Sequence, residues 1–185
     1  MRVVVGISGA SGAALGLRVL EVLTEIGAET DLVISTAAER TIAAELGTSG
    51  LGRISALATR RHDIHNIGAP IASGSVRTAG MIVAPCSVRT LAAIAHSLSD
   101  NLLVRVADVH LKERRPVLLM VRETPLHIGH LRAMMAATEM GVIIMPPAPA
   151  FYLKPDSINA AVDQLARRAI DLLNLAPLTA VAWQD

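Results

Sequence analysis

The residues best suited to chemistry stand directly after short apolar segments of the sequence. A glycine-rich turn follows the segment at 3–7, and hydroxyl side chains or an arginine follow three later segments. The residues in these positions are Gly9, Ala10, Ser11, Ser35, Ser87, Thr90 and Arg122. Backbone N–H groups, hydroxyls and a guanidinium all donate hydrogen bonds to anionic oxygen. The set therefore predicts a ligand that carries a phosphate and a polar ring.

The first turn indicates which kind of nucleotide this ligand is. Its glycines stand at 6, 9 and 12. Ser35 stands at the position where a dinucleotide-binding site would have an acidic residue that binds the ribose. The chain has neither the GxxxxGK(S/T) motif of a P-loop nor the GxSxG motif of a nucleophile elbow. The turn is therefore typical of a mononucleotide site. The alternative is a tight turn that holds no ligand.

Apolar runs alternate with segments of helical periodicity along the chain. Strands are predicted at 2–8, 30–35, 80–87, 116–122 and 142–146, and helices at 12–27, 36–47, 87–98, 100–115, 126–141 and 156–174. Residues 48–78 show little periodicity and predict a long loop with a short strand or helix. Continuous apolar strands between helices indicate a three-layer α/β fold with a mostly parallel sheet.

Composition excludes several classes of function. The net charge of +1 gives no reason to expect nucleic acid, and no apolar run reaches the roughly 18 residues of a membrane span. One cysteine allows no internal disulfide, and the chain opens on a strand, so we expect a cytoplasmic protein. A content of 52% hydrophobic but only 2% aromatic residues indicates surface buried between subunits, hence a homo-oligomer.

Three stretches carry a resemblance to a known family: GISGASGAALGLRVLEVL, the long run from PCSVRT to LKERRPVLLMVRETP, and GVIIMPPAPAFYLKP. They closely resemble the UbiX-type flavin prenyltransferases, within the homo-oligomeric flavin-containing decarboxylase-like family. The resemblance implies a single flavin-binding domain over 1–185 with a Rossmann-like fold, and a dodecamer with active sites between subunits. Related peptidyl-cysteine and phosphopantothenoylcysteine decarboxylases carry a PASANT-type motif where this chain has PCSVRT, which argues against both.

The implied reaction joins the dimethylallyl group of dimethylallyl monophosphate to N5 and C6 of reduced FMN. The product, prenylated FMN, passes to a UbiD-type decarboxylase. The resemblance assigns the flavin site to Gly9, Ala10, Ser11, Ser35, Ser87, Val88, Arg89, Thr90 and Arg122. It assigns the prenyl-phosphate site to Arg105, Lys112, Glu123, Tyr152 and Arg168, with Ser73, Gly74 and Ser75 as a small-residue loop beside the flavin and Trp183 near the site.

This chemistry needs particular side chains, and the implied catalytic set is Glu123, Ser11, Tyr152, Trp183 and Lys112. Negative charge grows on the departing phosphate, and cationic side chains stabilise it without a metal. The rings of Tyr152 and Trp183 suit an allyl cation, while Glu123 or the released phosphate accepts the proton lost on ring closure. Arg114 and Arg115 are expected on a solvated helix face.

Other functions remain open at this point. A flavin-dependent decarboxylase and a non-catalytic flavin carrier subunit are the alternatives, although a carrier would not need so many cations. The HIGH sequence at 127–130 matches a motif of class I aminoacyl-tRNA synthetases, but it follows a late strand. The HxxH pairs at 62–65 and 127–130 have no third ligand in a fitting pattern, so no metal site is predicted. Cys86 lacks a histidine to activate it.

Overall fold

A six-stranded sheet forms the centre of the chain, in the strand order β3-β2-β1-β4-β5-β6. The computed structural model describes residues 1–175 and 178–181. The strands are β1 (Arg2–Ile7), β2 (Glu29–Ile34), β3 (Arg60–His62), β4 (Gly80–Cys86), β5 (Val117–Val121) and β6 (Ile143–Ile144). Every strand pair within these residues is parallel. The predicted α/β fold with a largely parallel sheet is confirmed.

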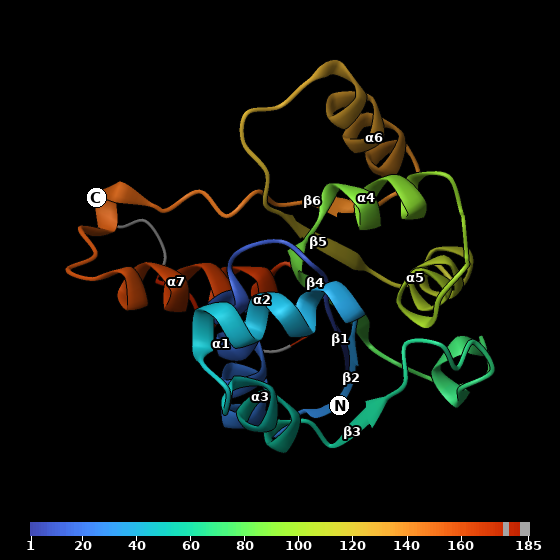
Figure 1. The fold of residues 1–185 in the computed structure, drawn as a ribbon, viewed down its shortest axis with the longest axis horizontal. Coiled ribbons are helices and arrows are strands. Elements are labelled where there is room, and N and C mark those ends of the chain that lie inside the picture. The colour runs from blue at the N-terminus through green and yellow to red at the C-terminus, as the bar shows by residue number, and fades with distance from the viewer. Residues whose placement is uncertain (176–177, 182–185) are drawn as a thin grey trace.

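Helices cover both faces of the sheet (Figure 1). They are α1 (Ala13–Glu25), α2 (Thr36–Leu46), α3 (Gly50–Leu57), α4 (Val88–Ala95), α5 (Leu102–Lys112), α6 (Ile128–Glu139) and α7 (Ile158–Asp171), with short 3-10 turns η1 (Pro70–Ala72) and η2 (Phe151–Leu153). One apolar cluster joins the sheet to α1, α2, α3 and α7, and a second joins it to α4, α5 and α6. The poorly periodic segment at 48–78 contains α3, β3 and η1.

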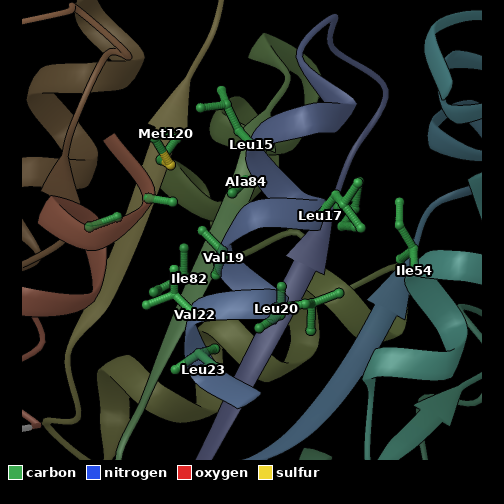
Figure 2. Close-up of a cluster of buried hydrophobic side chains, with 14 of the residues drawn as sticks. Leu15, Leu17, Val19, Leu20, Val22, Leu23, Ile54, Ile82, Ala84 and Met120 are labelled. Carbon is green, nitrogen blue, oxygen red and sulfur yellow. The ribbon is translucent and has the colours of Figure 1, made fainter. Parts of the chain in front are cut away.

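Alternation along the strands divides the core between the two faces. Val3 and Val5 of β1 belong to the cluster under α1, whereas Val4 between them belongs to the opposite cluster. Figure 2 shows the first cluster, where Leu20 of α1 and Ile82 of β4 are both fully buried. Each such side chain stabilises the fold by roughly 1.5–3 kcal/mol relative to an exposed one. The apolar runs of the sequence therefore account for a sheet that is buried on both faces.

The strand order creates a crevice at one edge of the sheet. The connection after β1 leads to β2 on one side, while β4 pairs with β1 on its other side. Parallel α/β sheets bind ligands at such a switch point, beyond the carboxyl ends of the strands. The fold therefore places the β1–α1, β2–α2 and β4–α4 junctions around one space.

Two parts of the chain project from this body (Figure 1). The segment between β6 and α7 extends away from the sheet before the chain returns through α7. Helix α6 buries only Ala133 and Ala137, and its exposed apolar side chains include Ile128 and Met135. Within the described residues, the helices are too short or too polar to cross a bilayer.

Candidate active site

A cleft of about 630 Å³ lies at the carboxyl ends of the strands. Its walls come from the β1–α1 turn, the first turns of α2 and α4, the segment after β3, the start of α5 and the end of β5. Its lining residues are Gly9, Ala10, Ser11, Ser35, Thr36, Ala37, Ile64, His65, Ser87, Val88, Arg89, Thr90, Asp100, Asn101, Leu103, Arg122 and Glu123. All nine residues predicted for the flavin site are among them.

Helices α2 and α4 point their N-termini at this cleft. Ser35 caps α2 by accepting a hydrogen bond from Ala38 N at 3.1 Å, and Ser87 caps α4 by accepting one from Thr90 N at 3.3 Å. The serine caps take the amide of the third residue, and the first two residues of each helix line the cleft. Helix N-termini carry partial positive charge and free N–H groups, so this wall is suited to an anion.

The N-terminus of α1 is arranged differently. Gly12 stands at its N-cap with φ of 111° and provides no side-chain cap. The carboxylate of Glu45, at the end of α2, accepts hydrogen bonds from Gly12 N at 2.9 Å and Ala13 N at 2.7 Å. Burial alone would raise the pKa of Glu45, but hydrogen bonds from Ser11 and these two amides hold that pKa below its ordinary value. The amide of Gly12 in the predicted phosphate turn and that of Ala13, the first residue of α1, are therefore engaged by a side chain.

Charged groups of both signs follow β5. Arg122 N donates to Cys86 O at 3.0 Å, which fixes the backbone where β4 and β5 end together. The side chains of Arg122 and Glu123 line the cleft, and Glu123 Oε1 also accepts a hydrogen bond from Thr124 N at 3.0 Å. Arg89, also in the cleft lining, pairs with Asp100. The cleft thus offers a guanidinium for an anion and a carboxylate able to accept a proton.

A second group of predicted residues lies on α5, from Arg105 in its first turn to Lys112 at its end. Arg105 pairs with Asp108 at 2.9 Å, and Lys112, two turns further along the same face, pairs with Glu113 at 2.7 Å. The loop that carries Ser73, Gly74 and Ser75 meets this end of the helix, since a Cβ on Gly74 would lie 3.1 Å from Lys112 Nζ. Of the prenyl-phosphate residues predicted, the cleft itself contains only Glu123.

The remaining predicted residues lie in a third place. Tyr152 belongs to η2 and is 53% exposed, in the segment that extends from the sheet (Figure 1). Arg168 is exposed on the last turn of α7. Trp183 falls outside the described residues. A single chain does not bring Tyr152, Arg168 and Lys112 to the lining of the cleft.

The expectation of a solvated helix face is wrong for Arg115. Its guanidinium donates to Gly74 O at 2.6 Å and to Val76 O at 2.7 Å, so it is bound to the loop in front of β4. Sequence spacing gives no sign of this contact, because the partners stand about forty positions apart along the chain.

The histidines of the HIGH sequence are held by local contacts, and Cys86 is buried. In the HIGH sequence, His127 caps α6 through Nδ1, which accepts a hydrogen bond from Gly129 N at 3.0 Å, and its ring centroid lies 3.6 Å from that of His130. Cys86 is buried at the end of β4, and burial raises the pKa of its thiol. Across residues 1–175 and 178–181, no three His, Cys, Asp or Glu side chains gather as a metal ion would require.

Comparison with known proteins assigns the chain to a family. The flavoprotein family model matches residues 1–170. The flavin prenyltransferase UbiX of Thauera aromatica is 55% identical over 175 residues, which are 95% of this chain and 90% of the relative. That of Escherichia coli K12 is 53% identical over 171 residues, 92% of this chain and 90% of the relative. The chain belongs to the UbiX-type flavin prenyltransferases of the flavoprotein family.

Solved UbiX structures share the whole fold. AnUbiX, crystallised in complex with FMN and dimethylallyl pyrophosphate, superposes with a TM-score of 0.95 at 46% identity and covers 100% of this chain and 97% of its own. A dodecameric FMN-dependent UbiX-like decarboxylase from Escherichia coli O157:H7 gives 0.94 at 42% identity, with 100% of both chains covered. The cypemycin decarboxylase CypD, at 12% identity and a TM-score of 0.64, shares the fold alone.

The motif-based prediction of a UbiX-type protein is therefore confirmed, whereas the roles of individual residues stay predictions. Sequence reasoning missed several lining residues of the cleft, among them His65 and Asn101, and it missed Glu45, which caps the helix next to the cleft. One signal was available: Gly12 precedes α1 without a side chain able to cap it, so the first amides of that helix need an acceptor from elsewhere. The sequence does not indicate that this acceptor comes from the end of α2.

Proposed function

We propose that this chain is a flavin prenyltransferase, which joins the dimethylallyl group of dimethylallyl monophosphate to N5 and C6 of reduced FMN. The observation that carries the proposal is the cleft at the switch point, in a chain of the same fold as AnUbiX crystallised with FMN and dimethylallyl pyrophosphate. The curated relatives at 55% and 53% identity are named for the same activity. We assign the activity to a single flavin-binding domain that spans residues 1–185.

The donor set of the cleft fits FMN. The first residues of α2 and α4 would hold its phosphate, and Arg122 would contact the flavin ring system. A cleft of about 630 Å³ falls in the range of ordinary cofactor sites. When bound and reduced, FMN supplies the nucleophilic nitrogen and the ring carbon that receive the dimethylallyl group. Gly9, Ala10 and Ser11 would form the floor beneath it.

The role of the basic residues follows from the leaving group. As the C–O bond of the prenyl phosphate breaks, negative charge grows on the phosphate, and Lys112, Arg105 and Arg168 would stabilise it in place of a divalent metal. The ring of Tyr152 would face the allyl cation, as would that of Trp183, which lies outside the described residues. Glu123, on the cleft wall beside Arg122, would accept the proton lost when the new ring closes.

We infer that neighbouring subunits complete the site. The cleft, the end of α5 and the η2–α7 region carry separate parts of the predicted set within one chain. A homo-dodecamer, as in the UbiX-like relative from Escherichia coli O157:H7, would bring them together, and the exposed apolar face of α6 would be buried in it. The product would then pass to a UbiD-type decarboxylase, in the cytoplasm.

Mass spectrometry of the flavin tests this function. The protein is incubated without oxygen with FMN, a reductant and dimethylallyl monophosphate, with and without EDTA. We expect the FMN to gain the mass of the dimethylallyl addition in both cases, because no metal takes part. Bound FMN of unchanged mass would indicate a carrier. Release of CO2 from an aromatic acid in place of prenylation would indicate a decarboxylase.

A further inference from the structure

The end of α5 turns one basic side chain back toward the body of the protein. The helix closes at Glu113, and Arg114 adopts the left-handed conformation with φ of 56°. Arg114 N donates to Leu111 O at 3.0 Å and Arg115 N to His110 O at 2.8 Å. This pair of bonds is a Schellman turn, which reverses the chain within two residues. As a result the side chain of Arg115 meets the loop before β4.

The guanidinium of Arg115 holds the loop before β4 at several points. One nitrogen donates to Val76 O at 2.7 Å and to Thr78 Oγ1 at 3.3 Å, and another donates to Gly74 O at 2.6 Å. These bonds are charge-assisted and fix the planar fork against two carbonyls of the loop. A single side chain therefore sets the path of residues 74–78.

A buried histidine supports the contact between Arg115 and the loop through a hydrogen bond to Thr78. His110 is fully buried, with Nδ1 at 2.8 Å from Val106 O and Nε2 at 2.8 Å from Thr78 Oγ1. A carbonyl only accepts, so Nδ1 carries the proton, and burial lowers the pKa of His110 and keeps the ring neutral. Nε2 therefore accepts from the Thr78 hydroxyl, whose oxygen accepts from Arg115. The chain of bonds runs from Arg115 through Thr78 to the interior of α5.

The anchored loop packs directly on the Lys112–Glu113 pair. A Cβ on Gly74 would lie 2.2 Å from Glu113 Oε1 and 3.1 Å from Lys112 Nζ, so the loop backbone approaches both side-chain ends closely. The hydroxyls of Ser73 and Ser75 lie 2.8 Å apart on either side of it. Two hydroxyls and an ammonium group are a suitable set for a phosphate, provided that the loop keeps its distance from the helix.

We propose that Arg115, supported by Thr78 and His110, is a positioning residue that holds the Ser73–Ser75 loop beside Lys112 for the phosphate of the prenyl substrate. The inference rests on the proposed function. It adds to the site an arginine that touches neither substrate nor flavin. It also predicts that loss of this arginine weakens binding of the prenyl phosphate but not of the flavin. Arg115 lies outside the cleft lining, so its loss should leave FMN binding intact.

The test compares Arg115→Met with Arg115→Lys and Arg114→Gly. We expect Arg115→Met to raise the KM for dimethylallyl monophosphate about tenfold, with kcat within about threefold and FMN affinity unchanged. Arg115→Lys keeps the charge and one arm of the fork, so part of the affinity returns. Arg114→Gly removes the same charge one residue earlier, at a left-handed position that glycine accepts, and should behave as wild type.

A second pair of variants and a direct binding measurement complete the test. Thr78→Val removes the hydroxyl between Arg115 and His110 and should raise the same KM, whereas Thr78→Ser keeps it. Calorimetric titration of dimethylallyl monophosphate into enzyme holding oxidised FMN, which does not turn over, should reproduce the KM changes. An unchanged KM in folded Arg115→Met, or FMN affinity and kcat that fall with it, would overturn the inference alone. A wild type that makes no prenylated FMN would overturn the proposed function and the inference with it.

Discussion

Glu45 Oε2 lies 2.7 Å from the backbone nitrogen of Ala13, so the end of α2 caps the start of α1. The two residues are 32 positions apart, and the contact joins the helices that follow β1 and β2. A carboxylate at a helix N-terminus is favourable because it meets both unpaired N–H groups and the positive end of the helix dipole. The contact closes one side of the β1–α1 turn next to the cleft.

Removing this cap should destabilise the protein by a measurable amount. Glu45→Ala leaves the amides of Gly12 and Ala13 without their acceptor, and we expect a loss of about 1–2 kcal/mol in the free energy of unfolding. Glu45→Gln keeps an acceptor oxygen without the charge and should lose about 0.3–1 kcal/mol. Urea unfolding measures both. Glu139→Gln, a surface carboxylate on α6, is the control and should change stability by less than about 0.5 kcal/mol.

Close approach of the first turn to α2 predicts an effect on flavin binding. A Cβ on Gly9 would lie 2.5 Å from Ala37 Cβ, so Gly9→Ala must push the β1–α1 turn away from the first turn of α2. Both segments line the cleft, and we expect FMN affinity to fall about tenfold or more in a fluorescence titration. Gly52→Ala has nothing within 4 Å of the added carbon and should leave affinity unchanged. Equal affinity in the two variants would contradict the prediction.

Asp31 links three strands and makes stability depend on pH. Its buried carboxylate accepts hydrogen bonds from Arg2 of β1 and from His62 of β3, the latter at 2.8 Å. Burial by itself would raise the pKa of Asp31, but these bonds outweigh it and hold that pKa below the ordinary value of 3.8. The contribution to stability is therefore complete above that value and is lost as the pH falls through the lower, folded-state pKa.

The pH profile of Asp31→Asn checks this assignment. We expect the variant to lose about 3 kcal/mol near neutral pH, because Arg2 is left without its partner, and to show a flatter loss of stability below pH 4 than wild type. Asp63→Asn, an exposed carboxylate in the loop after β3, should keep the wild-type profile. Parallel acid profiles for wild type and Asp31→Asn would show that Asp31 is not the group responsible.

Glu123 should matter for turnover and not for flavin affinity. If its carboxylate accepts the proton on ring closure, Glu123→Gln slows formation of prenylated FMN by roughly 10²–10⁴-fold while FMN binding stays nearly unchanged. A carboxylate that only pairs at the surface would cost about 0–1 kcal/mol instead. Rapid-mixing spectroscopy with reduced FMN and dimethylallyl monophosphate measures the rate. Wild-type rates in the variant would leave the released phosphate as the proton acceptor.

Local patterns predicted the elements and the edge of the sheet where the cleft lies. Ser35 and Ser87 follow buried strands and precede helices, so their place at helix N-termini beside the cleft follows from strand and cap signals alone. The predicted boundaries differ mainly at the ends: the helix predicted at 87–98 closes at Ala95, and the strand predicted at 142–146 is Ile143–Ile144. The last turn of a helix or the last residue of a strand depends on tertiary contacts, which the periodicity of apolar residues does not reveal.

Long-range contacts account for what could not be predicted. Arg115 stands in a run of charged residues that reads as a solvated helix end, and its true partners are carbonyls of a loop without periodicity. Every residue has a backbone carbonyl, so the spacing of side chains in the sequence does not indicate which carbonyl an arginine will bind. The prediction for Tyr152 and Arg168 is untested for another reason. A single chain places both residues apart from the cleft, and the family resemblance alone connects them to it.

The Glu45 cap has a consequence for the number of phosphates that the cleft can hold. Helices α1, α2, α4 and α5 all begin beside it, and the protein itself supplies the negative charge for α1. A second phosphate brought to the β1–α1 turn would meet a carboxylate in place of open amides, and repulsion between like charges would oppose it. We therefore expect FMN, with its single phosphate, to bind more tightly than FAD or NAD, and a fluorescence titration with all three would check this.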